Sequence, residues 1–406
     1  MVPKGWSSVQ AQDVCKSISV GVVIKPTQYY VPEGYGVKAF RSANVREGFI
    51  NDSDWVYFSH EGHAINKKSH LKTGDVLIVR TGYPGTACVV TPEFEGSNAI
   101  DIVIARPDMD KIIPEYLCAY TNSHIGKSQV LDLQGGMAQK HLNVGAYQVL
   151  KINLPPLREQ KKIAQILLTW DNAISVTEKL LANSQRQKKA LMQQLLTGNK
   201  RLLDENGVRF SGAWKWLRAA ELFKTISQKN NSEDEELLAV TQDLGVIPRS
   251  MLERRVVMPD GSTKGYKLVV PGNFIISLRS FQGGLEYSRY RGLVSPAYTV
   301  LTPIKKIVDE FYKQYYKSYD FIGHLAVAVI GIRDGKQISY EDFSFLKLPY
   351  PEIEEQQKIA AVLSAADAEI STLEKKLACL RDEKKALMQQ LLTGKRRVKV
   401  DEAVAE

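Results

Sequence analysis

Two segments of the chain, residues 159–198 and 355–394, place apolar side chains at alternating steps of four and three residues. This spacing is that of a coiled-coil seam and predicts one long helix in each segment. Prolines at positions 155, 156, 349 and 351 stop either helix from extending backwards, and Gly198 and Gly394 stand where a helix commonly ends. The predicted seam residues are Ile163, Leu167, Trp170, Ile174, Leu181, Leu191 and Leu195 in the first helix and Ile359, Leu363, Ile370, Leu373, Leu377, Leu387 and Leu391 in the second.

The two helical segments are copies of one sequence. At an offset of 196 residues, 24 of the 40 positions are identical, and residues 188–198 recur letter for letter as 384–394. The chain is therefore a tandem duplication. Lys188 and Lys384 interrupt the seam at equivalent places, where a lysine can set the register at some cost in stability. Trp170 corresponds to Ala366, and we expect this large and small pair to interdigitate if the helices pack on each other.

The regions ahead of each helix have a different pattern, with short β-rich runs separated by glycine and proline. We expect strands at 75–79, 87–90, 268–270, 274–278 and 298–301, and helices at 114–123 and 305–319. Trp6 followed by residues 16–19 resembles Trp214 followed by residues 224–227, so these regions are distant copies as well.

These patterns predict an α+β protein in which two α/β domains are separated by two long coiled-coil helices, with an internal pseudo-twofold repeat. The expected domains are 1–153 and 209–349, each α/β, and the helical segments 154–198 and 350–394. Residues 199–208 form the expected linker, and residues 395–406 the C-terminal tail.

Composition narrows the class of protein. The chain has 406 residues with 44% hydrophobic and 24% charged side chains, which excludes a disordered or collagen-like chain. Its longest apolar run, residues 325–332, is far shorter than the roughly 18 residues of a membrane span, and no apolar leader follows Met1. We therefore expect a cytoplasmic protein that does not enter a membrane. The net charge of +9 suits a partner with a phosphate backbone but does not identify one.

Three segments then carry a resemblance to a known family. Residues 154–164 read Leu-Pro-Pro-Leu-Arg-Glu-Gln-Lys-Lys-Ile-Ala, and residues 351–360 read Pro-Glu-Ile-Glu-Glu-Gln-Gln-Lys-Ile-Ala. Residues 74–82, Gly-Asp-Val-Leu-Ile-Val-Arg-Thr-Gly, match the family's style of recognition-domain strand. With the order of domains and the duplication, the whole chain resembles the specificity subunit of type I restriction–modification systems.

This resemblance implies a function. The two α/β domains would be target-recognition domains, each reading one half of a bipartite, asymmetric site on double-stranded DNA. The two helices would pack antiparallel, hold the readers apart and dock two modification subunits. Those subunits bind S-adenosylmethionine and methylate adenine at N6, and restriction subunits can join that complex. Glu352 and Glu354 stand where the first motif has Pro156 and Arg158, which questions whether both helices bind their partners equally well.

No catalytic pattern is present in the sequence itself. An adenine methyltransferase needs an Asp/Asn-Pro-Pro-aromatic motif and a glycine-rich cofactor loop, and residues 154–157 lack both the polar residue and the aromatic one. His60, His63 and His70 fall in one region without a cysteine or paired carboxylates at ligand spacing, and the four cysteines are scattered. We therefore expect a non-catalytic chain that binds no metal and no cofactor of its own.

The candidates for DNA contact are basic, amide and tyrosine side chains in turn-rich segments. Arginine can bridge guanine N7 and O6, and Asn or Gln can bridge adenine N6 and N7, whereas lysine more often binds phosphate. Each candidate has the alternative of being a solvated surface charge, and the arginines at 80 and 279, both beside a glycine turn, have the alternative of bracing that turn. The candidates are Arg41, Asn44, Lys67, Lys68, Arg80, Tyr83, Gln139 and Lys140 in the first domain and Arg254, Arg255, Arg279, Gln282, Arg289, Arg291, Arg333 and Lys336 in the second.

Two other functions fit parts of the sequence. A coiled-coil scaffold or adaptor without a DNA role accounts for the helices but not for two diverged, basic, turn-rich domains. A DNA-binding regulator that acts alone is the other alternative, and dependence of specific binding on a modification subunit would separate it from the specificity subunit.

The length of the predicted helices suits a spacer between two DNA-reading domains. A helix of 38 residues spans about 57 Å, enough to space two readers one turn of B-DNA apart, about 34 Å.

Overall fold

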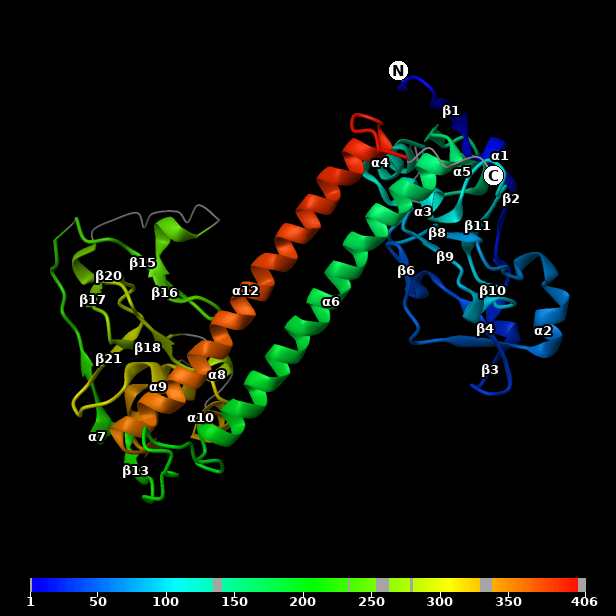
Figure 1. The fold of residues 1–406 in the computed structure, drawn as a ribbon. Coiled ribbons are helices and arrows are strands. Elements are labelled where there is room, and N and C mark those ends of the chain that lie inside the picture. The colour runs from blue at the N-terminus through cyan, green and yellow to red at the C-terminus, as the bar shows by residue number, and fades with distance from the viewer. Residues whose placement is uncertain are drawn as a thin grey trace. The chain divides into compact units, whose positions relative to one another are not determined.

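The computed structural model describes residues 2–133, 141–232, 234–252, 263–277, 280–328 and 338–400 (Figure 1). By their contacts these residues form two compact units. The first unit comprises residues 1–178 and 375–406, and the second comprises residues 179–374. Each unit therefore contains one α/β region together with half of each long helix. No helix in the described part of the chain is long and apolar enough to cross a membrane.

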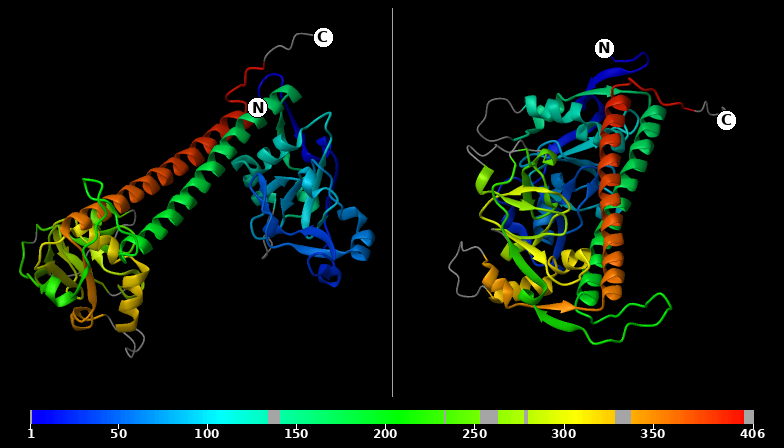
Figure 2. Two further views of the ribbon diagram at one scale, coloured as in Figure 1. Left: turned by 60° about the horizontal axis from the view of Figure 1, so that its bottom comes forward. Right: turned by 90° about the vertical axis from the view of Figure 1, so that its left-hand side faces the viewer.

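The two long helices are α6 (Leu157–Leu195) and α12 (Ile353–Leu392), which run side by side in Figures 1 and 2. In the first unit Asp171 pairs with Lys384, and Glu178 lies 2.6 Å from Arg381. Residue numbers thus rise on one helix as they fall on the other, so the pair is antiparallel. The predicted fold class, two α/β regions with long antiparallel helices and an internal repeat, is confirmed.

Ion pairs accompany the seam at equivalent places in the two copies. Lys384 binds Asp171 in the first unit, and Lys188 Nζ lies 2.5 Å from Asp367 Oδ1 in the second. Both lysines are therefore half-buried with a carboxylate partner. This pairing agrees with a role in setting the register of the helices, because shifting one helix along the other would separate both pairs at once.

Each predicted seam residue is buried or half-buried. Burial is deepest near the helix ends, as at Ile163 and Leu391. The expected interdigitation of Trp170 with Ala366 is wrong: Trp170 packs beside Leu387, because the antiparallel register brings Lys384 to the position opposite the residue that follows Trp170.

The first unit contains two four-stranded sheets, with orders β10-β4-β7-β3 and β2-β11-β8-β9, and the ribbons β1–β12 and β5–β6. The pair β10–β4 is parallel, and the other pairs are antiparallel. The strands are β1 (Ser7–Gln10), β2 (Cys15–Val20), β3 (Tyr30–Val31), β4 (Gly36–Phe40), β5 (Val45–Arg46), β6 (Phe49–Ile50), β7 (Val56–Ser59), β8 (Val76–Val79), β9 (Ala87–Val89), β10 (Asn98–Ala99), β11 (Ile102–Pro107) and β12 (Lys151–Leu154). The shorter helices are α1 (Ala11–Val14), α2 (His60–Ile65), α3 (Pro114–Asn122), α4 (His124–Leu133) and α5 (Val144–Gln148).

The second unit repeats one of these sheets in the same order, β14-β21-β18-β19, and adds the ribbons β13–β22, β15–β16 and β17–β20. The strands are β13 (Lys215–Arg218), β14 (Phe223–Ile226), β15 (Leu238–Thr241), β16 (Gly245–Pro248), β17 (Lys267–Val269), β18 (Phe274–Ile276), β19 (Glu286–Tyr287), β20 (Gly292–Val294), β21 (Thr299–Pro303) and β22 (Lys347–Tyr350). The shorter helices are α7 (Ala219–Leu222), α8 (Ser280–Gly283), α9 (Asp309–Tyr315), α10 (Tyr319–Ala328) and α11 (Tyr340–Ser344).

The predicted helix at 305–319 is wrong in its bounds. Gln356 accepts the backbone N–H of Val308, so helix α9 begins only after that residue. The chain then turns at Ser318, whose hydroxyl donates to Tyr315 O and accepts from Phe321 N, and α10 follows. The predicted helix at 114–123 is present as α3, and the predicted strands are present with shifted ends.

In both units the hydrophobic core joins the α/β region to the helices. One core contains Trp6 and Tyr116 with Ile163 from the start of α6 and Leu391 from the end of α12. The other contains Phe223 and Tyr312 with Ile359 from the start of α12 and Leu195 from the end of α6. Each α/β region is thus packed on the first turns of one helix and the last turns of the other.

Candidate nucleic-acid interface

The glycine turn after β8 is built around Arg80, which is only 8% exposed. Its guanidinium donates to Leu142 O at 3.0 Å and to Asp101 Oδ1 at 2.5 Å, and it contacts His141 Nε2. Arg80 therefore braces the turn and fixes the chain at residues 141–142 against it. The geometry favours the bracing alternative over base reading, since the side chain is buried and each of its three guanidinium nitrogens already has a partner within the fold.

Tyr83 lies at the tip of that same turn, between Gly82 and Gly85, which both have positive φ. Its side chain is 84% exposed. An exposed aromatic on a turn that is braced from beneath can contact nucleic acid without first leaving a core. Tyr83 is therefore a first-unit candidate whose position in the structure suits DNA contact.

The side chains of Asn44 and Arg41 are both engaged in hydrogen bonds within the first domain. Asn44 is fully buried, accepts from Arg41 N at 2.9 Å and donates to Ser53 O at 2.9 Å. The Arg41 guanidinium binds Asp54 through both its backbone oxygen and its carboxylate. Asn44 thus links Arg41 to Ser53 by hydrogen bonds, and its amide is not accessible to a base.

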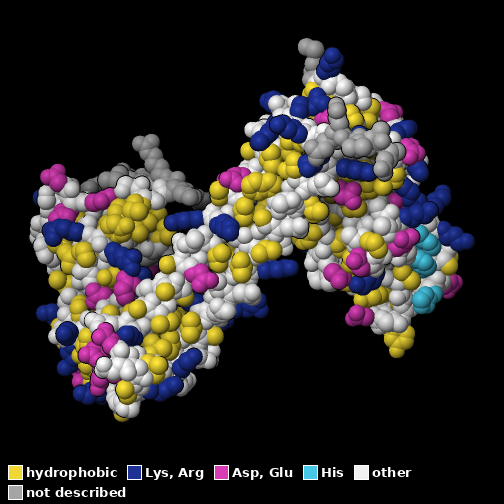
Figure 3. All heavy atoms as spheres, in the orientation of Figure 1, with side chains coloured by type: hydrophobic (Ala, Val, Ile, Leu, Met, Phe, Trp, Pro, Cys, Tyr) yellow, Lys and Arg dark blue, Asp and Glu magenta, His cyan; other side chains and the backbone are white. Residues whose placement is uncertain are grey.

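Lys67 and Lys68 lie in the 3₁₀ turn Lys67–Ser69, and both are exposed. Within the part of the chain that the structure describes, neither ammonium forms a hydrogen bond or ion pair. Beside them the rings of His63 and His70 stack with centroids 3.8 Å apart, and Figure 3 shows histidines gathered on this edge of the unit. Burial, together with His70 and His60, lowers the pKa of His63, so the His63 ring is mostly neutral near pH 7.

In the second unit, Arg289 and Arg291 lie in the loop between β19 and β20. Arg289 pairs with Glu310, and Arg291 Nη2 lies 2.8 Å from Glu235. More than half of each arginine side chain is exposed, and exposed pairs of this kind hold weakly. Both guanidiniums could therefore exchange a carboxylate for a phosphate.

The remaining candidates lie outside the described residues. Gln282 belongs to helix α8, but its side chain is not among those described. The others are Gln139, Lys140, Arg254, Arg255, Arg279, Arg333 and Lys336. Among the residues that are described, no group of three or more His, Cys, Asp or Glu side chains is placed to hold a metal ion.

The sequence did not single out a clamp that joins the helix ends in each unit. In the first unit the Glu159 carboxylate accepts from Trp6 Nε1 at 3.2 Å and from the Arg397 guanidinium at 2.5 and 3.0 Å. The arginine also lies over the indole ring, 5.6 Å from its centroid. This arrangement ties the segment after α12 to the first turn of α6.

The second unit repeats the clamp. Glu355 accepts from Trp214 Nε1 at 2.8 Å and from Arg201 at 2.6 and 2.7 Å. Arg201 and Arg397 lie 196 residues apart, the same offset as the two helix copies. Both follow the aligned helix segments, so an arginine conserved at this offset was the sequence signal that could have revealed the clamp. The Glu-Gln pair of the family motif therefore has a structural role, since the neighbouring Gln160 and Gln356 also cap the backbone ahead of α3 and α9.

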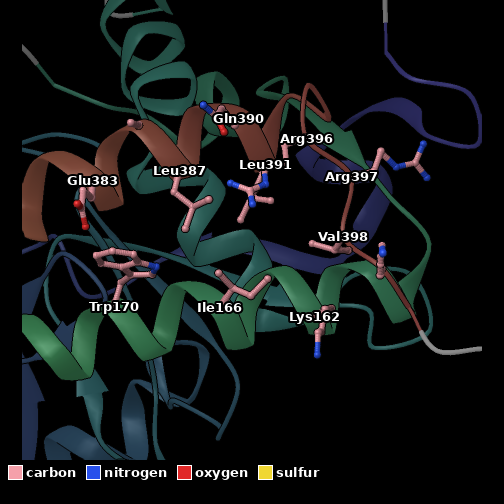
Figure 4. Close-up of a pocket in the computed structure, with 12 residues that line it drawn as sticks. Lys162, Ile166, Trp170, Glu383, Leu387, Gln390, Leu391, Arg396, Arg397 and Val398 are labelled. Atoms are coloured by element: carbon pink, nitrogen blue, oxygen red, sulfur yellow. The ribbon is translucent and has the colours of Figure 1, made fainter.

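A pocket of about 830 Å³ lies between α6 and α12 in the first unit (Figure 4). Ile166, Trp170, Leu387 and Val398 give it an apolar lining, and Lys162 is among its charged residues. The pocket is a groove between two helices, a shape that suits the side chains of a further helix.

Comparisons with known proteins agree with this architecture. A family model described as type I restriction modification DNA specificity domain matches residues 3–183 and 213–380. The MjaX type I restriction enzyme specificity subunit of Methanocaldococcus jannaschii is 27% identical over 440 residues, covering 98% of this chain and 95% of that protein.

Two solved structures share the fold. The S subunit of a type I restriction–modification system from M. genitalium has a TM-score of 0.58 at 12% identity, covering 96% of both chains. A chain from a type I R-M system, in a study of complex assembly and conformational transition, has a TM-score of 0.57 at 18% identity, covering 98% of this chain and 100% of that one. With the family model matching both copies of the repeat, the chain belongs to the type I restriction modification DNA specificity domain family.

Proposed function

We propose that this chain, a specificity subunit of a type I restriction–modification system, reads a bipartite and asymmetric site on double-stranded DNA. Each α/β region would read one half-site. The observation that carries the proposal is the duplication of one sheet, β2-β11-β8-β9 and β14-β21-β18-β19, with diverged loops on the same framework. A shared framework with different loops is what two readers of different sequences require.

The long helices would set the unread spacer between the half-sites. Each α/β region shares a hydrophobic core and a Glu-Arg-Trp clamp with the helix ends, as at Glu159 and Glu355. Rigid attachment of this kind would make helix length a determinant of spacer length. The described bounds of α6 give 39 residues, or about 58 Å at 1.5 Å per residue.

We further propose that the helices dock two modification subunits that bind S-adenosylmethionine and methylate adenine at N6, and that restriction subunits join through this complex. Leu168 and Val176 support docking in the first unit, because each is 56% exposed on an otherwise polar helix surface. Exposed apolar groups in one region commonly mark a protein interface. The chain itself would then supply recognition rather than catalysis.

The experiment that tests the proposal is single-molecule methylome sequencing of cells with and without this gene, each expressing the cognate modification subunit. A bipartite motif, methylated at adenine on both strands and lost with the gene, is the expected result. An unchanged methylome beside an active modification subunit would overturn the proposal and favour the scaffold. Sequence-specific binding by the chain without any modification subunit would favour a regulator that acts alone.

A further inference from the structure

Lys317 joins three segments of the second unit. It lies between α9 and α10, and its ammonium is 2.9 Å from Gly283 O, 3.2 Å from Gln242 O and 2.5 Å from Glu286 Oε1. An ammonium has three N–H donors, so all of them are used. The position of this one side chain therefore holds the β15–β16 turn against helix α8 and strand β19.

The carboxylate that holds Lys317 is buried. Glu286 is 1% exposed, and its Oε2 has no hydrogen-bond partner within the described part of the chain. A buried ion pair usually gains little net stability, because desolvation offsets the attraction. The pair Phe274–Tyr287 of the second unit corresponds to the pair Val76–Val89 of the first. The position equivalent to Glu286 is therefore Cys88 in the first unit. The charged pair is thus peculiar to the second recognition region.

The segment beside α8 is also fixed by close backbone contact. Gly284 has a φ of +76°, and a Cβ at this position would lie 1.7 Å from Tyr316 O. Only glycine allows this approach. Two contacts therefore hold the end of α8. One is the close approach of Gly284 to Tyr316 O, and the other is the hydrogen bond from the Lys317 ammonium to Gly283 O.

The turn that Lys317 holds has the form of a DNA-reading element. Strands β15 and β16 make a two-stranded antiparallel ribbon with an exposed tip at residues 242–244. The major groove of B-DNA admits a two-stranded ribbon. Gln242 is an exposed residue of this tip, and its amide can donate to adenine N7 and accept from adenine N6. Leu244, 65% exposed, can contact a thymine methyl.

The Gln242 amide lies over helix α8. A Cβ added to Gly283 would come within 2.9 Å of Gln242 Nε2. The side chain thus rests on the glycine surface that Lys317 fixes through Gly283 O. A change at position 283 would displace this amide while leaving the buried core untouched.

We propose that Gln242 reads a base of one half-site and that the Lys317–Glu286 pair is the positioning device that aims it. This inference rests on the proposed function, since it names the specificity determinant of one of the two readers. Lys317 acts through the turn and makes no contact with DNA itself.

The test uses the full chain with its modification subunits and a library of randomised duplex DNA, from which bound sequences are selected. Gln242→Ala should lose roughly ten- to hundredfold of its discrimination at an adenine position in one half-site, with the other half-site intact. Gly283→Ala should change the same position. Gln228→Ala, another exposed glutamine of this unit, serves as the matched control and should select the parental sequence.

Lys317→Met and Glu286→Gln test the positioning role. Both should alter the position that Gln242→Ala alters, and Lys317→Arg should restore it in part. The salt dependence of DNA binding should keep its slope in Lys317→Met, whereas loss of a phosphate contact would reduce the slope by about one. Thermal unfolding of each variant shows whether it is folded. If Lys317→Met does not fold, the variant at the exposed position, Gln242→Ala, decides the proposal.

Three results would overturn the inference: selection of the parental sequence by Gln242→Ala, equal loss at both half-sites in Lys317→Met, or a reduced salt slope. Failure of the proposed function is distinguishable, because the parental complex would then select no bipartite sequence at all.

Discussion

Arg397 donates two hydrogen bonds to Glu159, at 2.5 and 3.0 Å, although the two residues lie 238 positions apart in the chain. The pair fastens the segment after the second helix to the start of the first. The same relation recurs between Arg201 and Glu355, where both side chains are more buried. The duplication has therefore preserved a tertiary contact as well as a helix sequence.

This difference in burial predicts unequal effects of two equivalent substitutions. Glu355→Ala leaves Arg201 and the Trp214 N–H without their partner in a buried site, and we expect a loss of about 3–5 kcal/mol in the free energy of unfolding. Glu159→Ala should cost less, because Arg397 can turn to water. Urea unfolding of both variants measures the difference, and the double variant with Arg201→Ala should recover part of the loss. Equal destabilisation by both single variants would contradict this reasoning.

Arg80 and Tyr83 should separate stability from DNA contact. Arg80→Met leaves Leu142 O and Asp101 without a donor, so we expect a loss of about 1–3 kcal/mol in stability along with disturbed DNA binding. Tyr83→Ala removes an exposed ring and should weaken DNA binding at unchanged melting temperature. Thermal unfolding and DNA titration of the two proteins provide the comparison. An Arg80→Met protein of parental stability that has lost preference at a single guanine would instead identify Arg80 as a base reader.

The stability of the second unit should depend on pH through Glu286. Burial raises the pKa of this carboxyl from its ordinary 4.5 to about 7, with Lys317 opposing the change. Because the folded-state pKa is the higher one, its contribution to stability is fully present below pH 4.5 and is lost as the pH rises through 7. Each pKa unit corresponds to about 1.4 kcal/mol.

Glu286→Gln is neutral at every pH and should lack this dependence. Urea unfolding between pH 4.5 and 8 should show the parental protein losing stability relative to the variant up to about pH 7 and running parallel above it. Parallel curves over the whole range would show that the carboxyl keeps an ordinary pKa in the folded protein.

Lengthening both helices should change the spacer but not the half-sites. One heptad inserted after Glu178 and one after Glu374, at the division between the two units, adds about 10.5 Å to each helix. At about 3.4 Å per base step, the methylated motif should gain about three unread base pairs. Methylome sequencing gives the readout, with insertion into one helix alone as the control, which should prevent the pairs Lys384–Asp171 and Lys188–Asp367 from forming together. An unchanged spacer in the double insertion would refute the ruler.

The exposed apolar positions of α6 should matter for assembly rather than for folding. We expect Leu168→Asp with Val176→Asp to leave the melting temperature unchanged and to reduce the complex from two modification subunits to one, because both residues lie in the first unit only. Native mass spectrometry counts the subunits. Gln165→Glu, an exposed polar position on the same helix, is the control, and retention of both subunits by the double variant would place docking elsewhere.

The sequence alone determined the helices, the duplication and the fold class. Seam spacing and terminal prolines and glycines are local signals, and they predicted α6 and α12 to within a few residues. Local signals also placed α3, but they failed at residues 305–319, where Gln356, far along the chain, takes the backbone N–H of Val308.

Only the tertiary structure decided which polar residues are free to act. Arg80, Asn44 and Tyr83 look alike as candidates in a turn-rich sequence, yet the first two are engaged in buried hydrogen bonds and the third is exposed. The partners of Arg80 lie 21 and 62 residues away, and those of Lys317 lie 31 to 75 residues away. Hydrogen-bond partners at such separations are set by how strands and helices pack, a long-range property that residue type and local spacing do not encode.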